Sequence, residues 1–241
     1  MQFQYFLLAL AGLVVFGVNV VFGDDFIVYS PYVTKGQSEA ELRVSSQLDN
    51  QININGTHAI QSSISHAWTS WWRPELYIAS FERPARGNLK QTGYELENIF
   101  QLSPEGKYIA DGGFLLSYAY KSQEGVPNTI EFGPLLERHD KHFDEKVNLI
   151  WEKETGRNAS NKYAFRTAVS LTYHVKKQIS PSIEMYFRPN DHSYQIGPVI
   201  VGEILNNKQG AEIEYRIGTI FGINKAAPNM TILGSIAYEF F

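Results

Sequence analysis

Residues 165–175 read FRTAVSLTYHV, and this stretch decides the fold class. Apolar or aromatic side chains fall on nearly every second position from Phe165 to Val175, whereas the positions between them are polar or small, among them Arg166 and His174. Successive side chains of a β-strand point to opposite faces, so the segment predicts a strand with one apolar and one polar face. The final segment repeats this alternation from Ile232 to Phe240.

About a dozen segments of this kind follow one another, each separated by Gly, Pro, Asn, Asp or Ser. The expected strands are 39–47, 58–70, 73–83, 92–102, 110–121, 128–139, 142–154, 163–175, 181–188, 193–204, 211–222 and 230–240. This pattern favours an all-β fold, a single antiparallel, closed transmembrane barrel of about twelve strands with short loops. A water-soluble two-sheet sandwich would show the same alternation, so periodicity alone leaves it open.

Composition narrows the class of protein. The formal charge of −4 and the pI near 5.9 provide no basic surface for phosphates, which argues against a nucleic-acid partner. The absence of Cys excludes disulfides and thiolate-bound metals. Aromatic residues make up 14% of the chain and gather near the expected strand ends, where a barrel would leave a membrane.

The N-terminus predicts export. Residues 6–22 are apolar apart from Asn19, and Val21 and Gly23 stand at the −3 and −1 positions of an expected cleavage site. We therefore expect a signal peptide over residues 1–23 and a barrel over residues 24–241. No Lys or Arg precedes the apolar run, and an uncleaved anchor helix is the alternative.

The C-terminus carries a resemblance. Residues 236–241 read IAYEFF, which resembles the terminal strand that the barrel-assembly machinery of Gram-negative bacteria recognises. Tyr238, Phe240 and Phe241 are the expected assembly signal. The last three hairpins, which include residues 195–198, 221–222 and 226–229, resemble a group of small transporter-like bacterial outer-membrane proteins. The resemblance implies a barrel in the bacterial outer membrane, with its lipid as partner, and implies no catalytic residue.

The polar faces of the strands define the expected lumen. Its charged and titratable residues are Glu95, Glu97, Glu131, Glu137, Lys146, Glu152, Glu154, Arg166, His174, Glu184, Arg188, Glu203, Glu212, Glu214, Arg216 and Glu239. Such a lining predicts a hydrated network of ion pairs. We expect it to favour passive passage of small solutes, with a preference for cations because carboxylates are in excess. The alternative is a plugged barrel that serves as a structural or partner-binding element.

Two further kinds of site are weaker candidates. Residues 137–145 hold His139, His142 and several carboxylates, a set that suits a divalent metal, but a polar turn needs no ligand, and we expect no metal or other cofactor. An outer-membrane lipid-modifying enzyme would need a nucleophile beside a base, and His174 with Ser170 or Ser193 is the best pairing. We expect a channel and not an enzyme.

Overall fold

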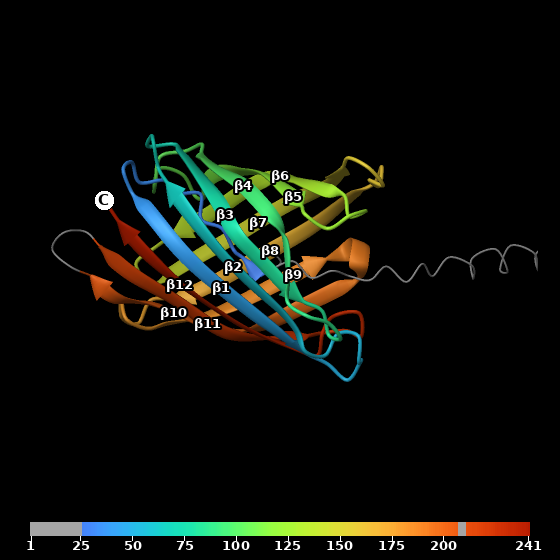
Figure 1. The fold of residues 1–241 in the computed structure, drawn as a ribbon. Helices are drawn as coiled ribbons and strands as arrows, with labels where there is room; N and C mark the ends of the chain where they lie inside the picture. Colours follow the sequence, from blue (N-terminus) through green and yellow to red (C-terminus); the bar gives the residue numbers. More distant parts are fainter. Residues whose placement is uncertain (1–25, 207–210) are drawn as a thin grey trace, which may run out of the picture.

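The computed structural model describes residues 26–206 and 211–241, and these form a closed antiparallel barrel of twelve strands (Figure 1). The strands are β1 (Ser38–Leu48), β2 (Thr57–His66), β3 (Trp72–Arg83), β4 (Lys90–Gln101), β5 (Asp111–Lys121), β6 (Asn128–His139), β7 (Phe143–Thr155), β8 (Tyr163–Tyr173), β9 (Ser180–Arg188), β10 (Ser193–Asn206), β11 (Glu212–Gly222) and β12 (Met230–Phe240). The expected fold class and strand count are confirmed. The expected signal peptide over residues 1–23 lies outside the described residues.

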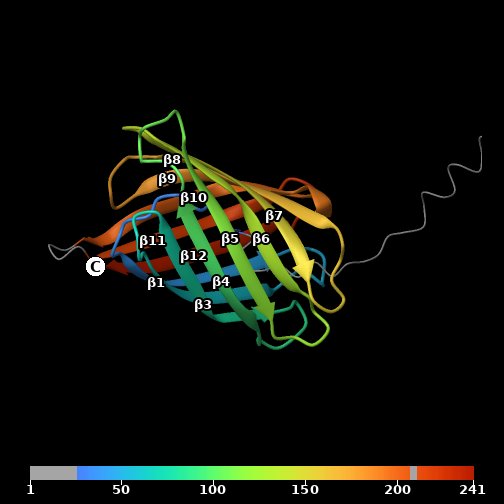
Figure 2. The ribbon, with the colours of Figure 1, turned by 90° about the horizontal axis from the view of Figure 1, so that it is seen from above.

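Each strand pairs with its sequence neighbours, and β1 closes the barrel against β12 from Ser38 opposite Phe240 to Leu48 opposite Met230. A rotated view shows how strongly the strands tilt (Figure 2). We call the end that holds the start of β1 and Phe241 the C-terminal end, and the opposite end the loop end. None of the helices in the described ranges is long and apolar enough to cross a membrane.

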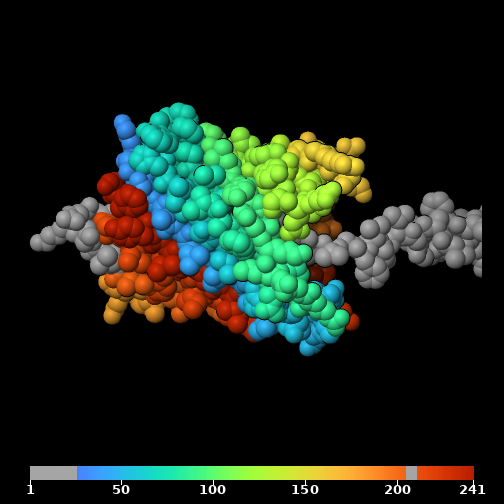
Figure 3. Space-filling view, in the orientation of Figure 1, coloured from blue at the N-terminus to red at the C-terminus, as the bar shows by residue number. Residues whose placement is uncertain are grey.

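The outer surface is apolar where a water-soluble protein would be polar. Side chains exposed on the strands include Leu42, Val44, Ile64, Leu76, Ile78, Leu96, Leu116, Leu171, Ile183, Ile217, Ile232 and Ile236. On the face turned to the viewer in Figure 3, side chains of adjacent strands cover the wall continuously. Exposed aromatics stand near both ends: Trp68, Trp71, Tyr173 and Tyr238 at the C-terminal end, and Tyr94, Tyr118, Tyr120 and Tyr163 at the loop end. An apolar band between two aromatic girdles is the surface of a lipid-embedded barrel.

An inward glycine, Gly133, allows a close backbone approach between β6 and β7. A Cβ at Gly133 would lie 1.9 Å from the backbone oxygen of Leu149, closer than any real side chain approaches. The regular pairing of these strands is also interrupted there, between Phe132 opposite Trp151 and Leu135 opposite Asn148. Only a residue without a Cβ fits at this close approach of the two strands.

We predict that Gly133→Ala destabilises the barrel by about 1–3 kcal/mol or more, because the backbone of β7 must move to admit a methyl group. The measurement is the denaturant midpoint of the purified protein, followed by its heat-modifiable mobility on gels. Gly112→Ala is the matched control, since no atom lies within 4 Å of a Cβ at that position. Equal midpoints for the two variants would contradict the close-packing argument.

Candidate functional site

The chain that precedes β1 runs inside the barrel (Figure 1). We call residues 26–37 the lumen segment. Phe26, Ile27, Tyr29 and Val33 are all buried, each less than 9% exposed. Because a barrel of this size is too wide for its own side chains to fill, a segment of backbone takes up the space at mid-depth.

Alternate side chains of the lumen segment pack against opposite walls. Ile27, Tyr29 and Val33 belong to one cluster with inward residues of β4 to β7, namely Ile99, Leu115, Leu135 and Ile150. Phe26 and Val28 pack against inward residues of β8 to β12, namely Ala168, Tyr186, Val199, Ile220 and Leu233. This period of two is that of extended chain, so residues 26–33 form an apolar layer across the lumen.

Polar side chains of the wall bind the backbone of the lumen segment. The N–H of Tyr29 donates to Asn148 Oδ1 at 2.6 Å, and Asn148 Nδ2 donates to the carbonyl of Tyr29 at 3.0 Å. The N–H of Val33 donates to Gln101 Oε1 at 2.8 Å. Buried backbone groups need partners, and here wall side chains supply them.

Hydroxyl groups of the segment add two contacts with wall carboxylates. Ser30 Oγ donates to Glu137 Oε2 at 2.6 Å, and the Tyr32 hydroxyl donates to Asp111 Oδ2 at 2.9 Å. A hydroxyl bound to a carboxylate makes a charge-assisted hydrogen bond, which is stronger than a neutral one. Both carboxylates belong to the same side of the barrel as Gln101 and Asn148, so the segment is tethered along β4 to β7.

Two cavities lie on opposite sides of the apolar layer. A cavity of about 660 Å³ at the loop end is lined by Phe26 together with Glu131, Glu152 and Arg188. A cavity of about 630 Å³ at the C-terminal end is lined by Ile27 and Val28, and by side chains such as Glu214 and Arg216. Between them Leu115, Leu135 and Ile150 are completely shielded from solvent. The barrel therefore has a water-accessible vestibule at each end and a dry layer between.

The wall of the loop-end vestibule carries a chain of ion pairs. Arg166 contacts Glu131, and its Nε lies 3.2 Å from Glu152 Oε1. The other oxygen of Glu152 accepts from Arg188 at 2.9 Å, and Arg188 also reaches Asp191 at 3.1 Å. Two arginines thus share Glu152, and charges on β6, β7, β8 and β9 are joined.

Glu154 also lines the loop-end vestibule, and other expected lumen charges lie deeper or nearer the C-terminal end. Arg216 binds Glu184, and its guanidinium also donates to the Tyr186 hydroxyl at 2.7 Å. Glu95 and Glu97 are buried on β4. The carboxylates of Glu212 and Glu214 lie close to that of Glu203.

His174 lies in a group that the sequence did not indicate. Its Nε2 is 3.0 Å from Asp144 Oδ2, and Asp144 Oδ1 contacts His139. Of the two serines considered as nucleophiles beside His174, Ser170 lies on β8 and Ser193 begins β10. The sequence grouped His139 with His142 within residues 137–145. In the structure His139 is grouped instead with Asp144 and with His174, which lies outside that run.

Sequence reasoning missed the lumen segment and the charges of β1 and β3. Arg43 binds Glu41 and lies 3.9 Å from Glu75, and Arg73 lies 3.9 Å from Glu39. The alternation Glu39, Glu41, Arg43 has the same period of two and would have placed these residues in the lumen. The signal for the lumen segment was the set of apolar residues on inward positions, such as Leu115 and Ile150, which a fully hydrated lumen would not contain.

Solved structures with a similar fold are outer-membrane channels by their names. The NanC porin aligns with a TM-score of 0.55 at 10% sequence identity, covering 84% of this chain and 99% of that one. The COG4313 outer membrane channel from Pseudomonas putida F1 aligns with a TM-score of 0.57 at 9% identity, covering 86% and 96%. No family model matches the chain, and no curated protein matches it in sequence. The likeness shows the fold, a barrel of porin-like architecture.

We predict that Arg166→Ala lowers the free energy of unfolding by about 3–5 kcal/mol, because Glu131 and Glu152 would then lose a partner in a poorly solvated place. Arg166 is only 4% exposed. Arg138→Ala is the control, since its pair with Glu145 is half exposed and spans 3.9 Å. Denaturant midpoints of the two variants measure the difference, and a similar small loss in both would show that the buried network is not a stabilising element.

Proposed function

We propose that this protein is a bacterial outer-membrane channel for small solutes, held closed by residues 26–33. The observation that carries the proposal is the arrangement of two vestibules of about 660 and 630 Å³ on either side of a dry layer made by those residues. A wall that served only as a scaffold would need no wet vestibule at both ends. The apolar outer surface and its two aromatic girdles support the membrane location.

The way the lumen segment is held supports displacement. Asn148, Gln101, Glu137 and Asp111 reach it with side chains, so the hydrogen bonds of residues 29–33 are separate from the strand ladder. Rotation of those side chains would release the segment while every strand stays paired. Opening would then expose a few buried apolar side chains and break these hydrogen bonds. The barrel itself would stay closed.

Small polar solutes match the vestibule linings. The C-terminal vestibule is lined by Glu39, Glu41, Asp144, Glu184, Glu203 and Glu214, and by Arg43, Lys146, Lys176, Lys177 and Arg216. Both signs of charge are present in nearly equal number, so this vestibule suits dipolar or weakly charged solutes. The excess of carboxylates is small, and we propose no more than a weak preference for cations.

The plugged barrel is the second candidate. The deep burial of Phe26 and Tyr29 favours it, because a segment packed like a protein core can serve stability alone. The two candidates differ in what removal of the segment does. If the segment is a gate, its removal yields an intact barrel that conducts. If the segment is a structural core, its removal yields a destabilised barrel that conducts no better.

We predict that deletion of residues 26–33 raises single-channel conductance in planar bilayers at least several-fold, because the dry layer is removed and the vestibules become continuous. Asn148→Ala is a milder variant, which removes both tethers to the Tyr29 backbone and should increase the open fraction without any deletion. Asn98→Ala is its control, since Asn98 contacts Trp72 and the Leu116 carbonyl away from the segment.

Heat-modifiable mobility on gels shows whether each variant is folded before conductance is recorded. A folded deletion variant that conducts no more than the complete protein would overturn the gated channel and favour the plugged barrel. Unchanged gating in Asn148→Ala, with an open deletion variant, would assign the closure to packing and not to the hydrogen bonds.

We further propose that the C-terminal aromatics are read by the barrel-assembly machinery. Tyr238 and Phe240 stack at 5.5 Å between ring centroids and are exposed on the outer face of β12, and Phe241 is 66% exposed. Exposed aromatics on the closing strand are available to a partner before the barrel closes.

Deletion of Phe240 and Phe241 should lower the amount of folded protein in the outer membrane, measured by membrane fractionation. Normal levels of heat-modifiable protein would refute this role.

A further inference from the structure

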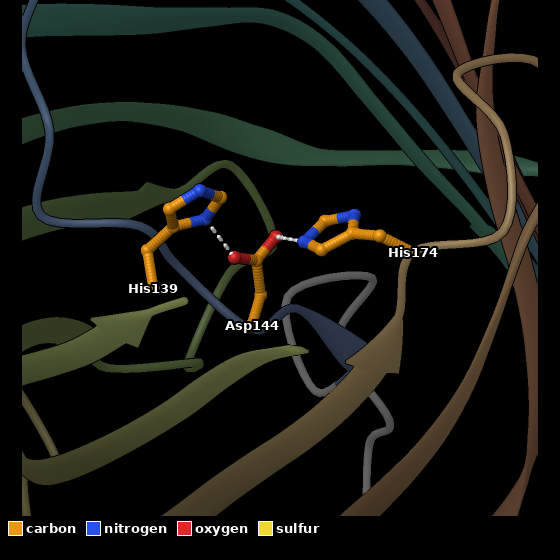
Figure 4. A group of neighbouring side chains, drawn as sticks. All are labelled: His139, Asp144 and His174. Carbon is orange, nitrogen blue, oxygen red and sulfur yellow. Dashed lines mark hydrogen bonds and ion pairs between the residues drawn. The ribbon is translucent and has the colours of Figure 1, made fainter. Parts of the chain in front are cut away.

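Two histidines and an aspartate meet at the C-terminal end of the barrel. His139 is the last residue of β6, Asp144 is the second residue of β7, and His174 directly follows β8. Figure 4 shows both imidazole rings turned toward the carboxylate from opposite sides. Asp144 Oδ1 contacts His139 Nδ1, and Asp144 Oδ2 lies 3.0 Å from His174 Nε2.

We propose that His139, Asp144 and His174 bind a divalent transition-metal ion, with Zn²⁺ as the representative. One ligand atom from each residue lies within 4.8 Å of the others. Two imidazole nitrogens and a carboxylate oxygen at about 2.0–2.2 Å from the ion form a known open zinc site with water in the remaining position. A modest rearrangement of the side chains, in which the contact between His139 and Asp144 lengthens, brings the three atoms to that distance from one ion.

The proton balance of binding is simple. In the metal-free protein Asp144 Oδ1 is hydrogen-bonded to His139 Nδ1, and Asp144 Oδ2 lies 3.0 Å from His174 Nε2, a buried nitrogen without a hydrogen-bond partner among the described residues. Each neutral ring can instead carry its proton on the other nitrogen, which frees a lone pair on Nδ1 of His139 and on Nε2 of His174. Each ring keeps its single proton on the nitrogen that faces away from the ion, so binding releases no proton and needs no oxidant or other reactant.

Two cations near Asp144, Lys146 and Arg138, are paired with other carboxylates. Lys146 Nζ lies 3.6 Å from Glu137 Oε1, and Arg138 lies 3.9 Å from Glu145. Both positive side chains therefore have carboxylate partners outside the three-residue group. The carboxylate of Asp144 faces two imidazole rings. This set of ligand atoms suits a divalent transition-metal ion better than an ammonium group.

The turn between β6 and β7 holds the first two ligands in place. The N–H groups of His142 and Phe143 donate to Asp140 Oδ1 at 2.8 and 3.0 Å, and these hydrogen bonds lower the pKa of Asp140 below its usual range. His139 and Asp144 are directly paired across this hairpin. The third ligand, His174, is held beside this turn by a hydrogen bond from its backbone N–H to the His142 carbonyl at 2.8 Å.

The site lies at the edge of the C-terminal vestibule. Asp144 and His174 line the C-terminal cavity, so a bound ion would stand at its edge and join the β6–β7 hairpin to the end of β8. Metal binding is independent of the proposed channel function. The ion can be bound by a gated channel and by a plugged barrel alike.

The test is titration of the complete, tag-free protein in detergent with Zn²⁺, followed by isothermal calorimetry. We expect one saturable site per chain. His174→Ala and Asp144→Asn should each weaken Zn²⁺ binding on the order of tenfold or more, since each removes a ligand or its charge. His142→Ala is the matched control because His142 lies in the same turn and outside the three-residue group, and it should bind as the unmodified protein does.

Heat-modifiable mobility verifies that every variant is folded. The proposal is overturned if the unmodified protein takes up no Zn²⁺ in a saturable way, or if His174→Ala binds as tightly as His142→Ala. Equal weakening in His142→Ala and His174→Ala would also overturn it, because the ion would then be bound by the turn as a whole. Excess Mg²⁺ should not displace Zn²⁺, since a site with two imidazoles discriminates against oxygen-seeking ions.

Discussion

Closure of the β1–β12 ladder is the constraint on which the structure depends. In a bilayer no water is present to satisfy an open strand edge, so the first and last strands must pair along their whole length. They do so over eleven residue pairs, from Ser38 opposite Phe240 to Leu48 opposite Met230. Once the ladder is closed, outward side chains at membrane depth face lipid and inward ones share a confined lumen, which explains the alternation in sequence.

Closure creates the problem that the lumen segment solves. A ring of twelve strands leaves more space at its centre than wall side chains fill, and that space must be wet or occupied. At mid-depth the wall carries apolar side chains on β5 to β7, such as Leu135 and Ile150, beside polar ones such as Asn148 and Glu97. The segment packs on the apolar side chains and is hydrogen-bonded to Asn148, so the wall fixes where the segment lies.

Alternation in the sequence was enough to predict the strands and the face on which residues such as Arg166 and Leu171 lie, because it follows from the pleat alone. It could not predict which residues meet across the lumen. That depends on the stagger between strands, which placed His174 beside Asp144 and Arg216 beside Glu184. The lumen segment lies outside any strand, so its only signal was indirect, in apolar residues on inward strand positions such as Leu115 and Ile150.

The wall and the lumen segment are stabilised by different interactions. Ion pairs such as Arg166 with Glu152 and Arg216 with Glu184 join strands to one another, and the charged partners in each pair belong to the wall. The segment is held by apolar contacts and by hydrogen bonds from side chains such as Asn148. Displacement of the segment would therefore leave the bracing charges paired, and the barrel could open its lumen without losing the interactions that keep its wall closed.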